Sequence, residues 1–167
     1  MIYGLTQLGV VHTLISLIAV AAGVVAFFRY GRISPANTAG RWYIITTIHT
    51  CLTALGIFQH GGFGKPHALA IITLVVLAIA WVAGKTSLFG RASRYVETVL
   101  YTLTFLFHMI PAVTETTTRL PLGAPLLPNA DAPQLQTASA ALFVLFLLGA
   151  AYQVWRMRGE PAPSAQA

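Results

Sequence analysis

Five long apolar stretches, separated by loops that hold most of the charged residues, constrain this chain more than any other feature of its sequence. They cover about residues 6–28, 42–59, 67–84, 95–113 and 137–155. Each has a length near the roughly 20 residues with which an α-helix crosses a bilayer. Only 8% of the 167 residues are charged and 56% are hydrophobic, whereas soluble domains are roughly 25% charged. The sequence therefore predicts an all-α integral membrane bundle of five transmembrane helices.

Residues 1–158 form one transmembrane domain in this interpretation. The segment before residue 29 contains no Lys or Arg, so it lacks the basic start of a secretory signal peptide and is interpreted as a retained first span. Residues 159–167 are polar and rich in Pro and Ala, a composition typical of a disordered tail. We expect helices one to four to form the bundle and the fifth to pack outside it.

Basic residues predict the orientation of the spans. Cytoplasmic loops carry an excess of Lys and Arg, and here eight such residues fall on one side of the predicted membrane, whereas Lys65 and Arg119 fall on the other. The sequence thus predicts an amino terminus outside, a carboxyl terminus in the cytoplasm, and a multi-pass protein of a bacterial inner membrane. An interfacial aromatic belt is expected at the cytoplasmic span ends, formed by Trp42, Tyr43, Tyr95, Tyr152 and Trp155.

Several function classes are disfavoured by the same composition. A pI near 10 does not indicate nucleic-acid binding, because the basic residues lie between apolar spans and not on one soluble face. Cys51 is the only cysteine, so there is no internal disulfide, CxxC zinc site or CxxCH haem-attachment motif. The chain has no HExxH, GxSxG or P-loop motif, which argues against a protease, lipase or ATPase. No particular enzyme reaction is predicted.

The fourth span carries the most informative polar pattern. Helical spacing places its ionisable and hydroxyl residues along one face, namely Glu97, Tyr101, Thr104, His108 and Glu115. Ionisable residues inside a membrane helix usually face the bundle and mark a functional site. Glu97 follows Arg94 by three residues, a spacing that suits a local ion pair.

All five histidines fall in the middle or the outer half of the predicted bundle. His12 and His108 lie at similar depths, about 9 Å from the outer ends of their spans at 1.5 Å per residue. His60 and His67 flank the outer loop. His49 lies deepest, near the middle of the second span, on the same helical face as His60.

This arrangement favours a b-type haem or a transition metal bound in the outer half, for electron transfer or for assembly of a respiratory enzyme. Neutral imidazole is a common ligand of zinc, copper and iron, and two histidines on facing helices can ligate haem iron. His12 and His108 are the first-choice ligands and His49 and His67 the second, with all five histidines, including His60, as candidate metal ligands. Glu115, Gln59, Gln7 and Tyr101 are the candidate supporting partners of those ligands.

Two other functions are compatible with the sequence. Each histidine could simply donate a hydrogen bond to a neighbouring hydroxyl or carbonyl, and the protein would then be an accessory or structural subunit of a larger membrane complex or a homo-oligomer. The third interpretation is translocation of protons or a solute. The lipid bilayer is the one partner that all three interpretations share.

The chain resembles a group of uncharacterised bacterial membrane proteins that form a domain family of unknown function. The resemblance covers about residues 8–112 and is carried by His12, Gly23, the basic turn from Arg29 to Arg32, and Gly40 with Tyr43. Such proteins often have His-Arg before that second glycine, where this chain has Ala36-Asn37, so a role of that pair is not implied here. More distantly, four helices with four histidines are similar to b-type cytochromes of the b561 kind. Those proteins place two haems near opposite faces, so the one-sided histidines of this chain imply one haem at most.

Overall fold

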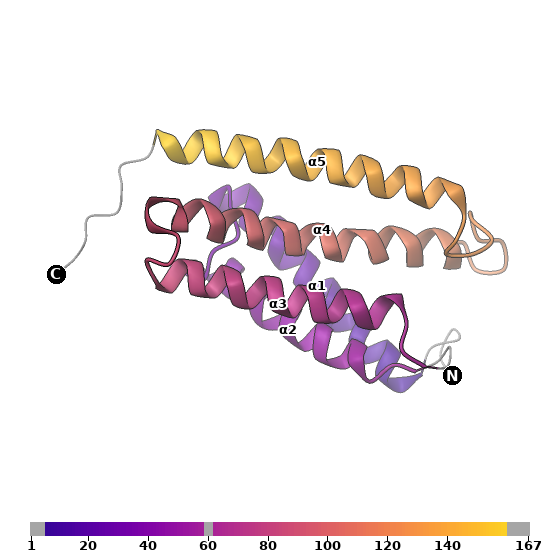
Figure 1. The fold of residues 1–167 in the computed structure, drawn as a ribbon. Coiled ribbons are helices and arrows are strands. Elements are labelled where there is room, and N and C mark those ends of the chain that lie inside the picture. Colours follow the sequence, from indigo (N-terminus) through magenta and orange to yellow (C-terminus); the bar gives the residue numbers. More distant parts are fainter. Residues whose placement is uncertain (1–5, 59–61, 160–167) are drawn as a thin grey trace.

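The computed structural model describes residues 6–58 and 62–159, and within these ranges the chain is all-α, with no strand. Five α-helices and one short 3-10 turn follow one another along the chain (Figure 1). The elements are α1 (Gln7–Tyr30), α2 (Thr38–Leu55), α3 (Lys65–Lys85), the 3-10 turn η1 (Gly90–Ala92), α4 (Ser93–Arg119) and α5 (Pro133–Arg158). The predicted fold class, an all-α bundle, is confirmed.

Four of these helices are long and apolar enough to cross a membrane: α1, α3, α4 together with η1, and α5. The helix α2 is the shortest, with 18 residues, and is not among the four. Its hydropathy is lowered by Arg41, His49 and a series of threonines. The chain is thus a multi-pass type of membrane protein by the length and composition of its helices.

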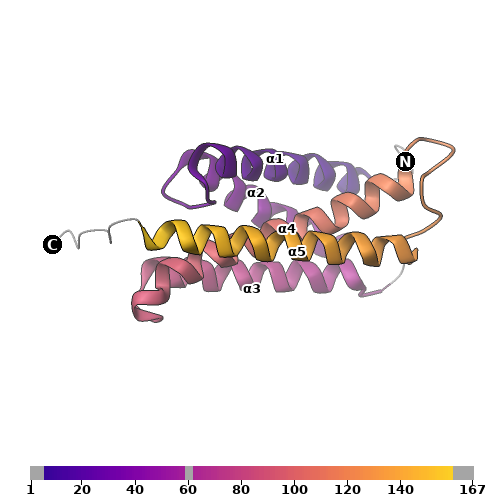
Figure 2. The ribbon, with the colours of Figure 1, turned by 90° about the horizontal axis from the view of Figure 1, so that it is seen from above.

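The helices lie lengthwise beside one another, with α5 on the outside of the bundle (Figures 1 and 2). The main packing partners are α1 with α2, α3 with α4, α2 with α3 and α4 with α5, and α1 also touches α4. Among the helices, α5 packs only against α4. The loops after α1 and α3 lie at the end where α5 finishes, and the α4–α5 loop lies at the opposite end (Figure 1).

The centre of the bundle is built from small residues and two tyrosines. Ala19, Ala26, Ala80, Tyr43 and Tyr101 are fully buried and belong to one core cluster. Small residues let helix backbones approach closely, which is how helices in lipid gain packing contacts. At this centre the polar side chains of α2 and α4 meet in two hydrogen bonds.

Several helix boundaries differ from the predicted ones; α2, for example, ends at Leu55 and not at the expected position 59. Three of the differences have identifiable reasons. The helix α2 begins four residues before the expected position 42, because the Asn37 side chain accepts a hydrogen bond of 2.7 Å from the Gly40 backbone N–H and caps the helix. The helix α4 continues six residues past the expected end at 113, through Pro111, to Arg119. Pro133 occupies the first turn of α5, where proline is well tolerated, so α5 starts four residues early.

Candidate functional site

His108 is held inside the bundle by a threonine of the neighbouring helix. Its Nε2 lies 3.0 Å from the Thr47 hydroxyl oxygen in a buried hydrogen bond between α4 and α2. Thr47 is fully buried and His108 is 8% exposed. The prediction that His108 faces the bundle interior is thus met in the structure, and its partner is a residue of α2.

A second pair of side chains continues this contact one turn further along both helices. The Tyr43 hydroxyl lies 2.8 Å from the Thr104 hydroxyl. Because Thr104 donates its own proton to the Tyr101 carbonyl oxygen at 2.8 Å, Tyr43 is the donor to Thr104. The Tyr43 ring also meets the His108 ring edge-on, with 5.8 Å between the ring centroids. Tyr43 is fully buried, so its predicted place in the interfacial aromatic belt is wrong.

His12 approaches the same face of α2 from α1. Its Nδ1 lies 3.1 Å from the Thr50 carbonyl oxygen and 3.0 Å from the Thr53 hydroxyl oxygen. A carbonyl oxygen can only accept, so Nδ1 carries the proton. In the neutral ring the Nε2 atom therefore keeps its lone pair and is free to accept a proton or to bind a metal.

His12 and His108 lie close enough for their charges to interact, and Glu115 lies within the same range of His12. We call the buried residues Thr104, Tyr43, Thr47 and His108, together with the half-buried His12, the polar row. Its members come from α1, α2 and α4. Hydrogen bonds join Thr104 to Tyr43 and Thr47 to His108, and a ring contact joins Tyr43 to His108. The two first-choice histidines of the sequence thus lie within electrostatic range of each other, with no hydrogen bond or ring contact between them in the described residues.

The other predicted histidines do not join the polar row. His49 is exposed on the outward side of α2, where its Nδ1 donates to the Ile45 carbonyl oxygen of its own helix at 2.8 Å. His67 is buried at the start of α3 between the rings of Phe58 and Phe63, with centroid distances of 4.7 and 5.4 Å. Its Nδ1 accepts a hydrogen bond from the Gly64 N–H. His60 lies outside the described residues.

The predicted supporting residues are also dispersed. Glu115 is exposed and pairs with Arg119 one turn further along α4. Gln7 is exposed at the start of α1, and Gln59 lies outside the described residues. Tyr101 is fully buried, and its hydroxyl has no hydrogen-bond partner within the described part of the chain.

Glu97 lies on the same face of α4 as His108, at the end of the helix opposite to Glu115. Its carboxylate lies against Gly84 of α3 and within electrostatic range of Arg32 and Lys85. Tyr101 lies one turn above and within electrostatic range of Glu97. No ion pair between Glu97 and Arg94 is present in residues 62–159, and Arg94 instead donates to the Tyr95 hydroxyl at 2.6 Å. The expected local ion pair is thus replaced by contacts with α3.

The described residues contain no group of three or more His, Cys, Asp or Glu side chains placed to hold a metal ion. Zinc sites in proteins normally have at least three such ligands; His60, one of the predicted ligands, lies outside the described residues, so metal binding stays a prediction. An axial pair for haem needs only two histidines, and His12 with His108 is the pair that could supply them. Haem and transition-metal binding therefore both stay predictions.

The sequence interpretation missed Thr47 and assigned Tyr43 to the membrane interface. Tyr43, Thr47 and Thr50 are spaced by four and three residues, which places all three on one face of α2. All three are buried. Tyr43 and Thr47 face Thr104 and His108 of α4, and the spacing of these α2 residues was the available signal.

The fold and this buried site define a helical membrane-type protein whose centre holds two histidines among hydroxyl side chains. Comparison with protein-family models, with curated proteins and with solved structures finds no match.

Proposed function

We propose that this protein transfers protons across the membrane along the face of α4 that contains the polar row. The observation that supports the proposal is the set of buried contacts that join Thr104 to Tyr43, Tyr43 to His108, and His108 to Thr47. Histidine and hydroxyl groups both accept and donate protons, so neighbouring members can pass a proton along. Ionisable residues inside membrane helices commonly form such relays.

The length of this face suits a transmembrane path. Glu97 and Glu115 are 18 residues apart on α4, which corresponds to about 27 Å at 1.5 Å per residue. The hydrocarbon core of a bilayer is roughly 30 Å thick. The two carboxylates would therefore lie near opposite ends of the path, with His12 and His108 closer to Glu115 and Tyr101 closer to Glu97.

Each group on the path has a definable role. His12 accepts a proton at Nε2, because its Nδ1 is occupied as a donor to Thr50. His108 exchanges protons with Thr47 through the hydrogen bond at Nε2. The Tyr101 hydroxyl, which has no partner within residues 6–58 and 62–159, supplies a free group between Glu97 and the polar row.

We infer that all five helices cross the membrane. The helix α2 packs against both α1 and α3 and turns its threonines into the bundle, so its low hydropathy reflects an interior polar face. The excess of basic residues at the end that holds the α1–α2 and α3–α4 loops supports a cytoplasmic location of that end. The amino terminus would then be outside, in a bacterial inner membrane.

Proton flux into vesicles tests the proposal. The purified protein is reconstituted into liposomes that contain a pH-sensitive dye, and a potassium diffusion potential is imposed with valinomycin. We expect proton entry above that of protein-free liposomes. His108→Ala should lower the flux about tenfold or more, the change that ~1.4 kcal/mol in the barrier produces.

His49→Ala is the matched control, because His49 is exposed on the outer side of α2 and lies away from the polar row. It should leave the flux unchanged. Flux no greater than that of empty liposomes, or equal flux in the two histidine variants, would reject proton transfer.

Haem binding is the second candidate function, because His12 of α1 and His108 of α4 lie within electrostatic range of each other. Held by a hydrogen bond at one nitrogen, each ring keeps the other nitrogen for a ligand role. An optical spectrum of the purified protein, before and after dithionite, tests this candidate. A Soret band that disappears in His108→Ala but not in His49→Ala supports haem; a colourless protein from haem-supplied cells rejects it.

A further inference from the structure

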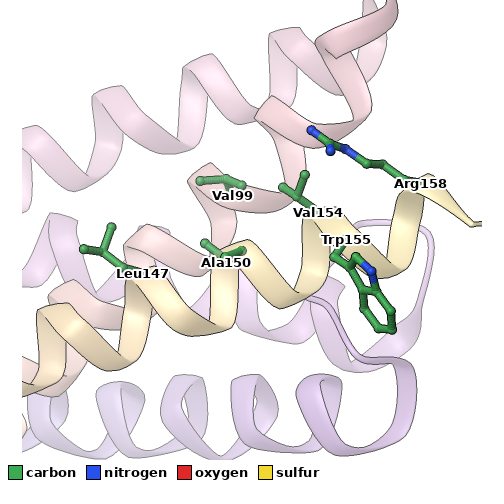
Figure 3. Close-up of a pocket in the computed structure, with 7 residues that line it drawn as sticks. Val99, Leu147, Ala150, Val154, Trp155 and Arg158 are labelled. Carbon is green, nitrogen blue, oxygen red and sulfur yellow. The ribbon is translucent and has the colours of Figure 1, made fainter.

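A shallow apolar groove of about 440 Å³ lies between α4 and α5 on the outside of the bundle. Its lining consists of Val99 on α4 and of Leu147, Ala150, Ala151, Val154, Trp155 and Arg158 on α5. Figure 3 shows Leu147, Ala150 and Val154 following one another along α5 toward Arg158, with Val99 across from them. The volume falls within the roughly 300–1,000 Å³ range of small-molecule sites.

The groove has one charged end and one apolar end. Arg158 is exposed in the last turn of α5 and forms no ion pair within the described part of the chain. Trp155, which is 71% exposed, lies one turn before it. An indole ring near a basic side chain is typical of the level at which lipid headgroups meet the hydrocarbon core.

The length of the groove matches one leaflet. Leu147 and Arg158 are separated by 11 residues, or about 16 Å along the helix axis. Half of the roughly 30 Å hydrocarbon core is about 15 Å. A groove that begins at the headgroup level near Arg158 therefore ends near the middle of the bilayer, where an acyl chain also ends.

The charge around this end selects the headgroup. Besides Arg158, the residues at this end of the bundle include Arg29 in the last turn of α1 and Lys85 in the last turn of α3. Basic side chains at the membrane surface attract anionic lipids, each by about fivefold in affinity. We propose that the groove binds one anionic phospholipid, with its phosphate at Arg158 and an acyl chain between α4 and α5.

Native mass spectrometry of the detergent-purified chain tests this site. The protein is titrated with phosphatidylglycerol or phosphatidylcholine of the same acyl chains, and bound lipid is counted at each concentration. We expect phosphatidylglycerol to bind more tightly, and Arg158→Gln to weaken its binding about fivefold. Binding of phosphatidylcholine should weaken less, because its choline ammonium offsets the charge of its phosphate. Arg91→Gln is the matched control, because Arg91 is exposed in η1 and does not line the groove.

A second variant distinguishes the contribution of the groove to lipid binding from that of the charge on Arg158. Ala151→Phe fills the groove while keeping Arg158, so it should reduce binding of both lipids and leave the helical circular dichroism unchanged. Equal binding of the two lipids by the unmodified chain, or equal effects of Arg158→Gln and Arg91→Gln, would overturn the proposal. Displacement of the lipid by millimolar inorganic phosphate would assign a free phosphate site, and a lipid-free dimer that Ala151→Phe dissociates would assign the groove to a second copy of the chain.

Discussion

Gln153 of α5 donates a hydrogen bond of 3.0 Å to the carbonyl oxygen of Gly31, 122 residues earlier in the chain. Its Oε1 accepts a second bond of 2.8 Å from the Thr102 hydroxyl of α4. The side chain is 6% exposed. This one amide therefore ties the outer helix α5 to α4 and to the residue that ends α1.

Gln153→Leu should loosen the attachment of α5. Hydrogen bonds between helices in a membrane contribute about 0.6 kcal/mol each on average, so loss of two should lower the free energy of unfolding by about 1 kcal/mol. Unfolding by increasing SDS in mixed micelles, followed by tryptophan fluorescence, measures the change. Gln136→Leu is the control, because Gln136 is exposed near the start of α5; equal effects of the two variants would contradict a specific role for Gln153.

Gly23→Ala should destabilise the bundle at the crossing of α1 and α4. A Cβ atom at position 23 would lie 2.6 Å from the Phe105 ring and 3.0 Å from the Tyr43 ring. Overpacking of this kind costs about 1–3 kcal/mol. The same SDS titration measures it, with Gly149→Ala as the control. A Cβ at position 149 meets nothing within 4 Å, so that variant should be neutral or more stable, by up to about 1 kcal/mol.

Gly40→Ala should be more damaging than Gly23→Ala. The added Cβ would collide with the backbone carbonyl and backbone nitrogen of Ser34, and backbone atoms cannot rotate aside as a side chain can. The loop before α2 would have to move, and the Asn37 cap on the Gly40 N–H would be lost. The amount of monomeric protein recovered after extraction, compared with Gly62→Ala, provides the readout. A Cβ at position 62 meets nothing within 4 Å, and equal recovery would contradict the prediction.

Helical periodicity along α4 accounted for much of the site. Spacing alone placed Tyr101, Thr104 and His108 on one buried face, and all three are buried in the structure. The helix continues through Pro111 to Arg119, beyond the expected end at 113, since proline removes only one N–H from the ladder. The threonine hydroxyls beyond it donate to carbonyls one turn back, as Thr114 does to Ile110.

The depth of a residue in the membrane predicted the members of the site less well than the direction in which its side chain faces. His49 was expected to join the other histidines because it lies in the same half of the bundle, yet it is exposed on the outer side of α2. The direction of each face depends on how α2 rotates against α1 and α3, which tertiary packing determines. The hydroxyl stripe of Tyr43, Thr47 and Thr50 carried that information, because polar side chains in a membrane helix turn toward the interior.

A double-mutant cycle on His108 and Thr47 separates a proton path from a purely structural hydrogen bond. Thr47→Val removes the hydroxyl that lies 3.0 Å from His108 Nε2 while preserving the shape of the side chain. Both single variants should lose stability, with a coupling energy of about 0.6 kcal/mol and at most about 1.7 kcal/mol. If the two residues act in series on one path, each single variant should also lower proton flux in liposomes, and the double variant should lower it no further. If Thr47→Val loses stability but keeps its proton flux, the hydrogen bond between Thr47 and His108 has a structural role only. The hydroxyl would then hold α2 and α4 together without carrying protons.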